Sequence, residues 1–111
     1  MNSKLQKRIE VIRRQGTRGR GRWLRVCSGS DPEGGLVISV RRKFGKAVRR
    51  NRVRRQIRAI CRDLSDDSWM ARLTLLSVDD QASEVPFAEL REDLERALRR
   101  AGVPVREPRI S

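Results

Sequence analysis

The segment from Arg41 to Arg62, RRKFGKAVRRNRVRRQIRAICR, constrains this chain most, because it is densely basic and holds no acidic residue. Apolar residues recur through it and just beyond it at helical spacing, namely Val48, Val53, Ile57, Ile60 and Leu64. A disordered basic arm lacks such an apolar stripe. The pattern therefore predicts a helix from about 47 to 64, with one face for a core and the other for anionic groups.

The charge balance indicates a polyanionic partner. The chain of 111 residues has 27 Lys and Arg against 14 Asp and Glu, a net charge of +13 and a pI near 11.6. A pI above about 9 is typical of nucleic-acid binders. Most of the basic residues are Arg, whose planar guanidinium makes bidentate contacts with phosphate. A GC-rich genome produces the same bias, so the preference for Arg does not decide the partner.

Several other classes lack their sequence signals. No apolar run reaches the roughly 18 residues of a membrane span, and the N-terminus does not read as a signal peptide. Cys27 and Cys61 fit no metal-binding spacing, and we expect both to be small buried side chains in a reducing cytoplasm. The chain has no His, the commonest general base and metal ligand. We therefore expect no membrane association, no metal site and no catalytic residue in this chain.

The remaining patterns predict one α+β domain over residues 1–111, with a compact core over about 4–102 and a loose tail over 103–111. Periodicity and turn residues predict two further helices, over 4–15 and from Pro86 to Ala101, and three strands, over 23–27, 36–40 and 69–78. Segments 17–21, 28–35 and 79–83 are expected to be loops. A small mixed β-sheet packed by about three helices follows, with the basic helix in a βαβ crossover.

The triplet Arg50-Asn51-Arg52, followed by Arg54, Arg55 and Arg58, resembles the RNR signature of the bacterial ribonuclease P protein family. The preceding LVISVRRKFGKAV is similar to that family's strand end, paired basic residues and glycine. The resemblance implies a subunit that helps a catalytic RNA to remove the 5′ leader of precursor tRNA. It also implies a left-handed βαβ crossover, and Mg²⁺ bound mainly by the RNA subunit. The partners implied are ribonuclease P RNA and precursor tRNA, with no obligate protein partner.

The resemblance also assigns residues to two surfaces. The surface expected to face the RNA subunit comprises Arg42, Lys43, Lys46, Arg50, Asn51, Arg52, Arg54, Arg55, Arg58 and Arg62. The surface expected to hold the single-stranded leader comprises Ile9, Arg13, Trp23, Arg25 and Cys27. Ile9, Arg13 and Cys27 stand where the family often has aromatic residues, and base stacking on an aromatic side chain contributes about 1–3 kcal/mol. We therefore expect weaker leader binding, or greater reliance on Arg13, Arg25 and Trp23.

Other interpretations remain open from the residues alone. A structural ribosomal protein would have the same composition, whereas a DNA-binding helix needs a partner helix before it and a protein-only nuclease needs His or grouped acids. For Trp23 and Trp69, a place in the sheet core is favoured over a stacking platform. The adjacent acids Asp66-Asp67, Asp79-Asp80 and Glu92-Asp93 are expected to be solvated or to cap helices.

Overall fold

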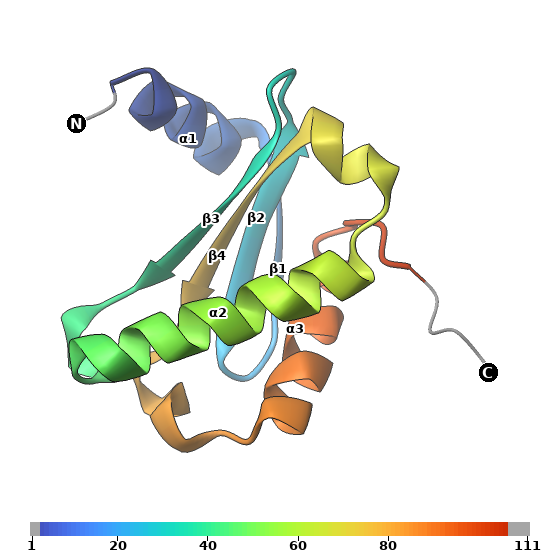
Figure 1. Ribbon diagram of the computed structural model, residues 1–111. Coiled ribbons are helices and arrows are strands. Elements are labelled where there is room, and N and C mark those ends of the chain that lie inside the picture. Colours follow the sequence, from blue (N-terminus) through green and yellow to red (C-terminus); the bar gives the residue numbers. More distant parts are fainter. Residues whose placement is uncertain (1–2, 107–111) are drawn as a thin grey trace.

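Three helices and four strands form residues 3–106, the part of the chain that this computed structural model describes (Figure 1). The helices are α1 (Ser3–Gln15), α2 (Ala47–Leu64) and α3 (Phe87–Arg100). The strands are β1 (Thr17–Arg20), β2 (Leu24–Ser30), β3 (Gly35–Val40) and β4 (Arg72–Val78). Short 3-10 turns lie between them: η1 (Arg42–Phe44), η2 (Asp67–Ala71) and η3 (Asp80–Glu84). The predicted α+β class with a small mixed sheet is confirmed.

The sheet has the strand order β1-β2-β4-β3. Strand β3 runs parallel to β4, whereas β1 and β2, and β2 and β4, are antiparallel. In Figure 1 both β3 and β4 run downward, β4 lies to the right of β3, and α2 crosses in front of the sheet. That arrangement is a left-handed βαβ crossover, an exception to the right-handed rule.

The two faces of the sheet are covered differently. Successive side chains along β2 and β4 point to opposite faces of the sheet, and the apolar ones pack into two clusters, one on each face. The larger cluster contains Leu24, Leu76 and, from α2, Ile57, with α3 also contributing. The smaller cluster joins Ile12 of α1 to Leu73 and Leu75 on the opposite face. Because α1 covers only part of that face, the rest of it stays open to a ligand.

Residues 17–21, expected to form a flexible loop, instead contain the edge strand β1. A Cβ on Gly19 would lie 2.2 Å from the carbonyl oxygen of Ala97 and 2.3 Å from the backbone nitrogen of Ala101. The glycine therefore lets the end of α3 lie directly against β1. Long-range packing decides this strand, because Thr17 is its only β-branched residue and Arg18, Gly19 and Arg20 give no local strand signal.

The strand expected over 69–78 begins only at Arg72, because residues 67–71 form η2. Asp66 starts this turn by accepting a hydrogen bond from the backbone N–H of Ser68, at 2.9 Å. Trp69 is half-buried against the main core, and its indole N–H donates to the carbonyl oxygen of Pro104 at 2.7 Å. Trp69 was expected in the core of the sheet. It packs only partly into the core, and it does so from the 3-10 turn η2 and not from a strand.

Three further expectations differ from the structure. Val48 was placed on the apolar stripe of α2, but it is 78% exposed. The segment from residue 103 was expected to be loose, yet Val103 is buried and the backbone N–H of Arg106 donates to the carbonyl oxygen of Leu64 at 2.6 Å. The rest of that tail, 107–111, lies outside the described residues. Asp93, expected to be solvated, is 1% exposed.

Candidate nucleic-acid interface

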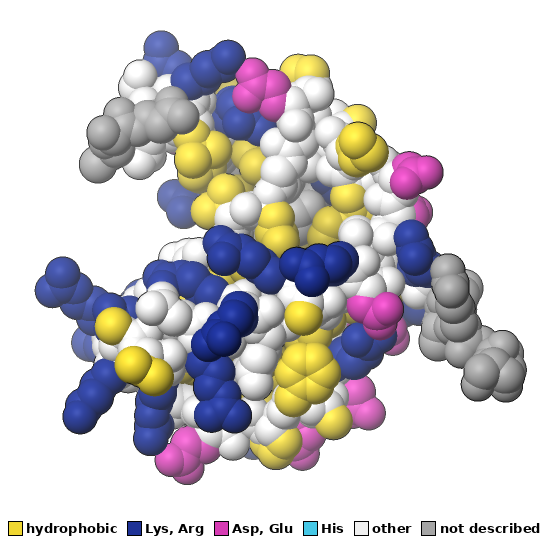
Figure 2. Space-filling view, viewed as in Figure 1, with side chains coloured by type: hydrophobic (Ala, Val, Ile, Leu, Met, Phe, Trp, Pro, Cys, Tyr) yellow, Lys and Arg dark blue, Asp and Glu magenta, His cyan; other side chains and the backbone are white. Residues whose placement is uncertain are grey.

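Lys and Arg side chains gather along the outer side of α2 on the face that Figure 2 shows. Val53, Ile57 and Ile60 direct one side of the helix into the core, which leaves the basic side chains on the remaining surface. Of the predicted RNA-facing residues on α2, five are exposed, namely Asn51, Arg52, Arg55, Arg58 and Arg62. Arg50 and Arg54 are half-buried.

None of the α2 arginines forms an ion pair with another described residue. The arginines that do form ion pairs within the described part of the chain all lie outside α2. The single ion pair of α2 runs through its carboxylate Asp63, to Arg91 of α3. Like charges at helical spacing repel one another and weaken the helix. Packing of the apolar face must offset this repulsion in the free protein, and a bound polyanion would relieve it.

Arg50 has a role inside the protein that the sequence pattern did not indicate. Its guanidinium Nη1 donates to the carbonyl oxygen of Gly45 at 2.7 Å, directly before the helix begins. Gly45 has a φ of 153°, in the region that favours glycine. Arg50 therefore secures the entry into α2. Arg54 Nη1 donates to Asn51 Oδ1 at 3.2 Å, which orients the amide of Asn51.

The turn before α2 extends the same basic surface. Arg42 and Lys43 are exposed on η1, and Lys46 is exposed at the residue that precedes α2. Phe44, between them, is buried and fixes the turn against the core. All ten residues predicted to face RNA thus lie on one continuous segment, from η1 through Lys46 into α2.

A second basic surface lies in a groove on the open face of the sheet. This groove, with a volume of about 580 Å³, runs over β1, β2 and β4 beside the end of α1. Its lining includes Arg13, Arg18, Arg20 and Arg25 around an apolar floor with Cys27 and Leu75, and Ser77 also contributes. Arg18 Nη2 donates to the carbonyl oxygen of Arg13 at 2.5 Å, which links β1 to α1 across the groove.

Of the residues predicted to hold a leader, the structure brings Arg13, Arg25 and Cys27 together in this groove. Ile9 packs beside Cys27 in the smaller core cluster, next to the groove. Trp23 lies elsewhere, half-buried against the main core with the guanidinium of Arg22 4.9 Å from its ring centroid. Trp23 precedes β2, which begins at Leu24, and it does not line the groove with Arg25 and Cys27.

Sequence reasoning missed the contribution of β1 to the groove. Arg18 pairs with Cys27 and Arg20 with Arg25 in the antiparallel register, so all four side chains share one face of the sheet. Recognising 17–20 as a strand would have predicted this, since paired residues point to the same side. The resulting groove is cationic and has no aromatic side chain in its lining.

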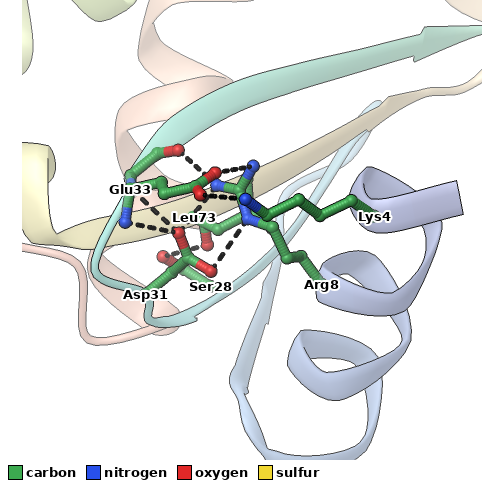
Figure 3. A network of polar contacts seen from close by, with 7 residues as sticks. Lys4, Arg8, Ser28, Asp31, Glu33 and Leu73 are labelled. Atoms are coloured by element: carbon green, nitrogen blue, oxygen red, sulfur yellow. Dashed lines mark hydrogen bonds and ion pairs between the residues drawn. The ribbon is translucent and has the colours of Figure 1, made fainter. Parts of the chain in front are cut away.

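A network of charged residues holds α1 in position beside the groove (Figure 3). Arg8 donates through Nε and Nη2 to the carboxylate of Asp31, at 3.0 and 2.7 Å, and through Nη2 to the carbonyl oxygen of Gly34 at 2.6 Å. Glu33 pairs with Arg8 at 3.1 Å and with Lys4 at 2.9 Å. The hydrogen bond between Arg8 and Asp31 lowers the pKa of the Asp31 carboxyl group and raises the pKa of the Arg8 guanidinium. The hydrogen bond from Lys4 lowers the pKa of the Glu33 carboxyl group.

The described residues offer no group of three or more His, Cys, Asp or Glu side chains that could hold a metal ion. Neither cysteine forms a disulfide, and burial raises the pKa of the Cys61 thiol to about 12. Between residues 3 and 106, no helix is long and apolar enough to cross a membrane.

Together, the fold and these two surfaces define a small basic α+β domain with an arginine-bearing helix and a cationic groove, both suited to a polyanion. The family model described as Ribonuclease P matches residues 4–102. The chain therefore belongs to the ribonuclease P protein family.

Relatives with curated names agree with that assignment. A "Ribonuclease P protein component" from Thermus oshimai is 45% identical over 91 residues, covering 81% of this chain and 58% of the relative. The Thermus aquaticus protein of the same name is 43% identical over 90 residues, covering 81% of this chain and 54% of its own length. The chain thus spans little more than half the length of these relatives.

Two solved structures have the same fold. The ribonuclease P protein from Thermotoga maritima has a TM-score of 0.67 and 26% identity, over 82% of this chain and 88% of that one. The one from Staphylococcus aureus has a TM-score of 0.73 and 23% identity, over 87% of this chain and 91% of that one. At 23% identity, the similarity to the Staphylococcus aureus structure establishes a shared fold only.

Proposed function

We propose that this chain is the protein subunit of ribonuclease P, acting in the cytoplasm on precursor tRNA. In this proposal the chain assists a catalytic RNA in the endonucleolytic removal of the 5′ leader. The observation that carries it is the unpaired arginine surface of α2, on a chain that belongs to the ribonuclease P protein family. The alternative of a structural ribosomal protein has no comparable support from the comparisons.

The α2 surface binds the RNA subunit. Guanidinium groups at Arg54, Arg58 and Arg62 recur along one flank of a helix whose rise is about 1.5 Å per residue, so they span several phosphates. Each contact that neutralises a phosphate releases condensed counterions, which makes such binding steeply dependent on salt. Asn51, oriented by Arg54, both donates and accepts hydrogen bonds, and so suits a base edge or a 2′-hydroxyl.

The groove binds the single-stranded leader. Its arginines offer contacts to phosphates on both sides of a floor formed by Cys27 and Leu75. Without an aromatic platform, this floor provides apolar contact but no base stacking. The proposed leader interaction is therefore mainly electrostatic and tolerant of leader sequence.

Hydrolysis belongs to the RNA subunit in this proposal, and Mg²⁺ is a ligand mainly of that RNA. The part of the chain that the structure describes gives no cluster of acids to hold the ion, so no chemical step is assigned to a protein-bound metal. The protein instead lowers the repulsion between two polyanions and holds the leader beside the RNA. Lower repulsion means that less Mg²⁺ is needed for the complex to form.

The test is cleavage of a precursor tRNA at low Mg²⁺ by a bacterial ribonuclease P RNA, with and without the protein. We expect the protein to restore correct 5′ processing, and Arg54→Ala with Arg58→Ala to abolish that effect. The matched control is Arg99→Ala, an arginine on α3 that pairs with Glu95 at 3.7 Å. A folded protein that binds the RNA but does not restore processing would refute the proposal.

The groove is tested separately with substrates that differ in leader length. Arg13→Ala with Arg25→Ala should weaken binding of a substrate with a leader of several nucleotides. The same variant should bind a substrate with a one-nucleotide leader as the unmodified protein does. Equal losses for both substrates would mean that the groove does not bind the leader.

A further inference from the structure

The basic surface of α2 extends over two flanks of the helix, and its arginines divide between them. Arg58 and Arg62 line a depression that also contains Trp69, next to the C-terminal end of α2. Arg49 and Arg52 line a different pocket on the other flank, against η3 and the start of α3. Figure 1 shows η3 and the start of α3 beside the N-terminal half of α2. The Arg49 flank is therefore a separate surface for which a ligand of its own can be sought.

The pocket on the Arg49 flank has an aromatic wall. It has a volume of about 370 Å³, and Phe87, the first residue of α3, lines it. Phe87 is 44% exposed, an unusual exposure for a large apolar side chain. Phe44, only 5% exposed, also lines the pocket and holds it against the core. A ring that stays accessible beside cations is the arrangement on which single-stranded nucleic acids stack their bases.

The charges of this pocket match one phosphate group. Arg49 and Arg52 are both exposed and make no ion pair among the described residues. Glu84 is the one carboxylate in the lining, so the three ionised side chains leave a net charge of one positive. A phosphodiester carries one negative charge, whereas a helical stretch of phosphates would face the glutamate as well. The charge balance therefore favours a single nucleotide over a duplex.

The pocket also holds a group that can recognise a base. Gln56, half-buried, also lines it, and its side-chain amide both donates and accepts hydrogen bonds. Amides of this kind form paired hydrogen bonds with base edges. The pocket thus combines a stacking ring, an amide and two cations.

We propose that this pocket receives one unstacked nucleotide of the RNA partner, with its base against Phe87 and its phosphate on Arg49 and Arg52. The inference rests on the proposed RNA-binding function and gives α2 a second contact, distinct from the Arg54–Arg62 flank. Recognition of a splayed base would fix the register of the protein on the RNA, which phosphate contacts alone do not do.

The test uses the full chain and two probes of equal charge, a single-stranded hexamer of adenylate and the same ribose-phosphate hexamer without bases. Binding is followed by NMR, through the ring signals of Phe87 and the side-chain amide of Gln56. We expect both to shift with the adenylate hexamer and to stay unchanged with the abasic one. Phe87→Ala should weaken binding of the adenylate hexamer roughly tenfold and leave the abasic affinity within about twofold.

Two variants make the result specific. Phe87→Leu keeps apolar bulk without a π face, so it should lose most of the preference for bases if the ring stacks. Val48→Ala removes a side chain that is 78% exposed elsewhere on α2 and should change neither affinity. Equal loss of both probes in Phe87→Ala, or no shift of the Phe87 and Gln56 signals, would overturn the proposal.

The binding readout is independent of cleavage, so the two proposals can fail separately. If the protein shows no preference for bases but still restores processing, the nucleotide-pocket proposal is wrong and the ribonuclease P proposal stands. If the preference is present but the protein does not restore processing, the pocket remains a nucleotide site and the ribonuclease P proposal is wrong.

Discussion

The carboxylate of Asp93 in α3 accepts a hydrogen bond from the backbone N–H of Trp23, at 2.9 Å, across 70 residues of sequence. The same carboxylate accepts from the backbone N–H groups of Arg22 and Leu24, and from Arg96 Nη1 at 3.1 Å. The N–H groups of Arg22 and Trp23 lie in the connection from β1 to β2, and that of Leu24 belongs to the first residue of β2, so the carboxylate satisfies backbone donors where the strand begins. Asp93 therefore joins α3 to the turn that leads into the sheet.

Replacement of Asp93 should destabilise the whole fold. Asp93→Ala leaves three backbone N–H groups without an acceptor, and we expect the free energy of unfolding to fall by about 3–5 kcal/mol. Urea unfolding followed by tryptophan fluorescence measures the change. The control is Glu92→Ala, the exposed neighbouring acid, which should change stability by less than about 0.5 kcal/mol. A similar effect of both variants would contradict the role of Asp93.

Gly19→Ala should separate β1 from α3. The added methyl group would meet backbone atoms of Ala97 and Ala101, which cannot move without displacing the end of the helix. We expect a loss of about 1–3 kcal/mol, measured by chemical unfolding. Arg20→Ala, on the same strand but exposed, is the control and should leave stability nearly unchanged. If Gly19→Ala were neutral, close packing of β1 on α3 would be wrong.

The pair of Arg8 and Asp31 should make stability depend on pH. Because Arg8 lowers the pKa of Asp31 below its ordinary value of 3.8, the folded state binds a proton there less readily than the unfolded state. The stabilisation is therefore complete at neutral pH and is lost as the pH falls through the lowered pKa. Unfolding measured between pH 7 and pH 2 should show a difference between the unmodified protein and Asp31→Asn that shrinks in acid. A constant difference would mean that the charge of Asp31 does not matter.

The α2 surface should account for much of the salt dependence of RNA binding. We expect Arg54→Ala to reduce the slope of log K against log salt concentration by about 0.7–0.9, the release expected for one phosphate contact. Arg58→Ala should do the same, and fluorescence anisotropy with labelled RNA at several salt concentrations measures both. Arg99→Ala, paired with Glu95, should leave the slope unchanged. An equal effect of Arg99→Ala would indicate diffuse charge and no defined surface.

Local patterns were sufficient for α2. The apolar spacing of Val53, Ile57 and Ile60 predicted the buried face of the helix, and the structure confirms it with each of them at most 4% exposed. The predicted bounds of this helix agree with Ala47–Leu64, because helical hydrogen bonds and i,i+4 contacts lie within a few residues. The resemblance carried by Arg50, Asn51 and Arg52 likewise depended on adjacent residues, and the family match agrees with it.

Only the tertiary structure determined the groove and the second flank of α2. Strand β1 exists because Gly19 allows α3 to approach, and it places Arg18 opposite Cys27. The buried position of Asp93 depends on a connection 70 residues earlier in the chain. Such contacts join distant segments, and neither the type of residue nor its periodicity encodes which segments meet. The sequence by itself thus determined the helix and its charge, whereas the fold decided which basic side chains share a surface, because that depends on packing between elements.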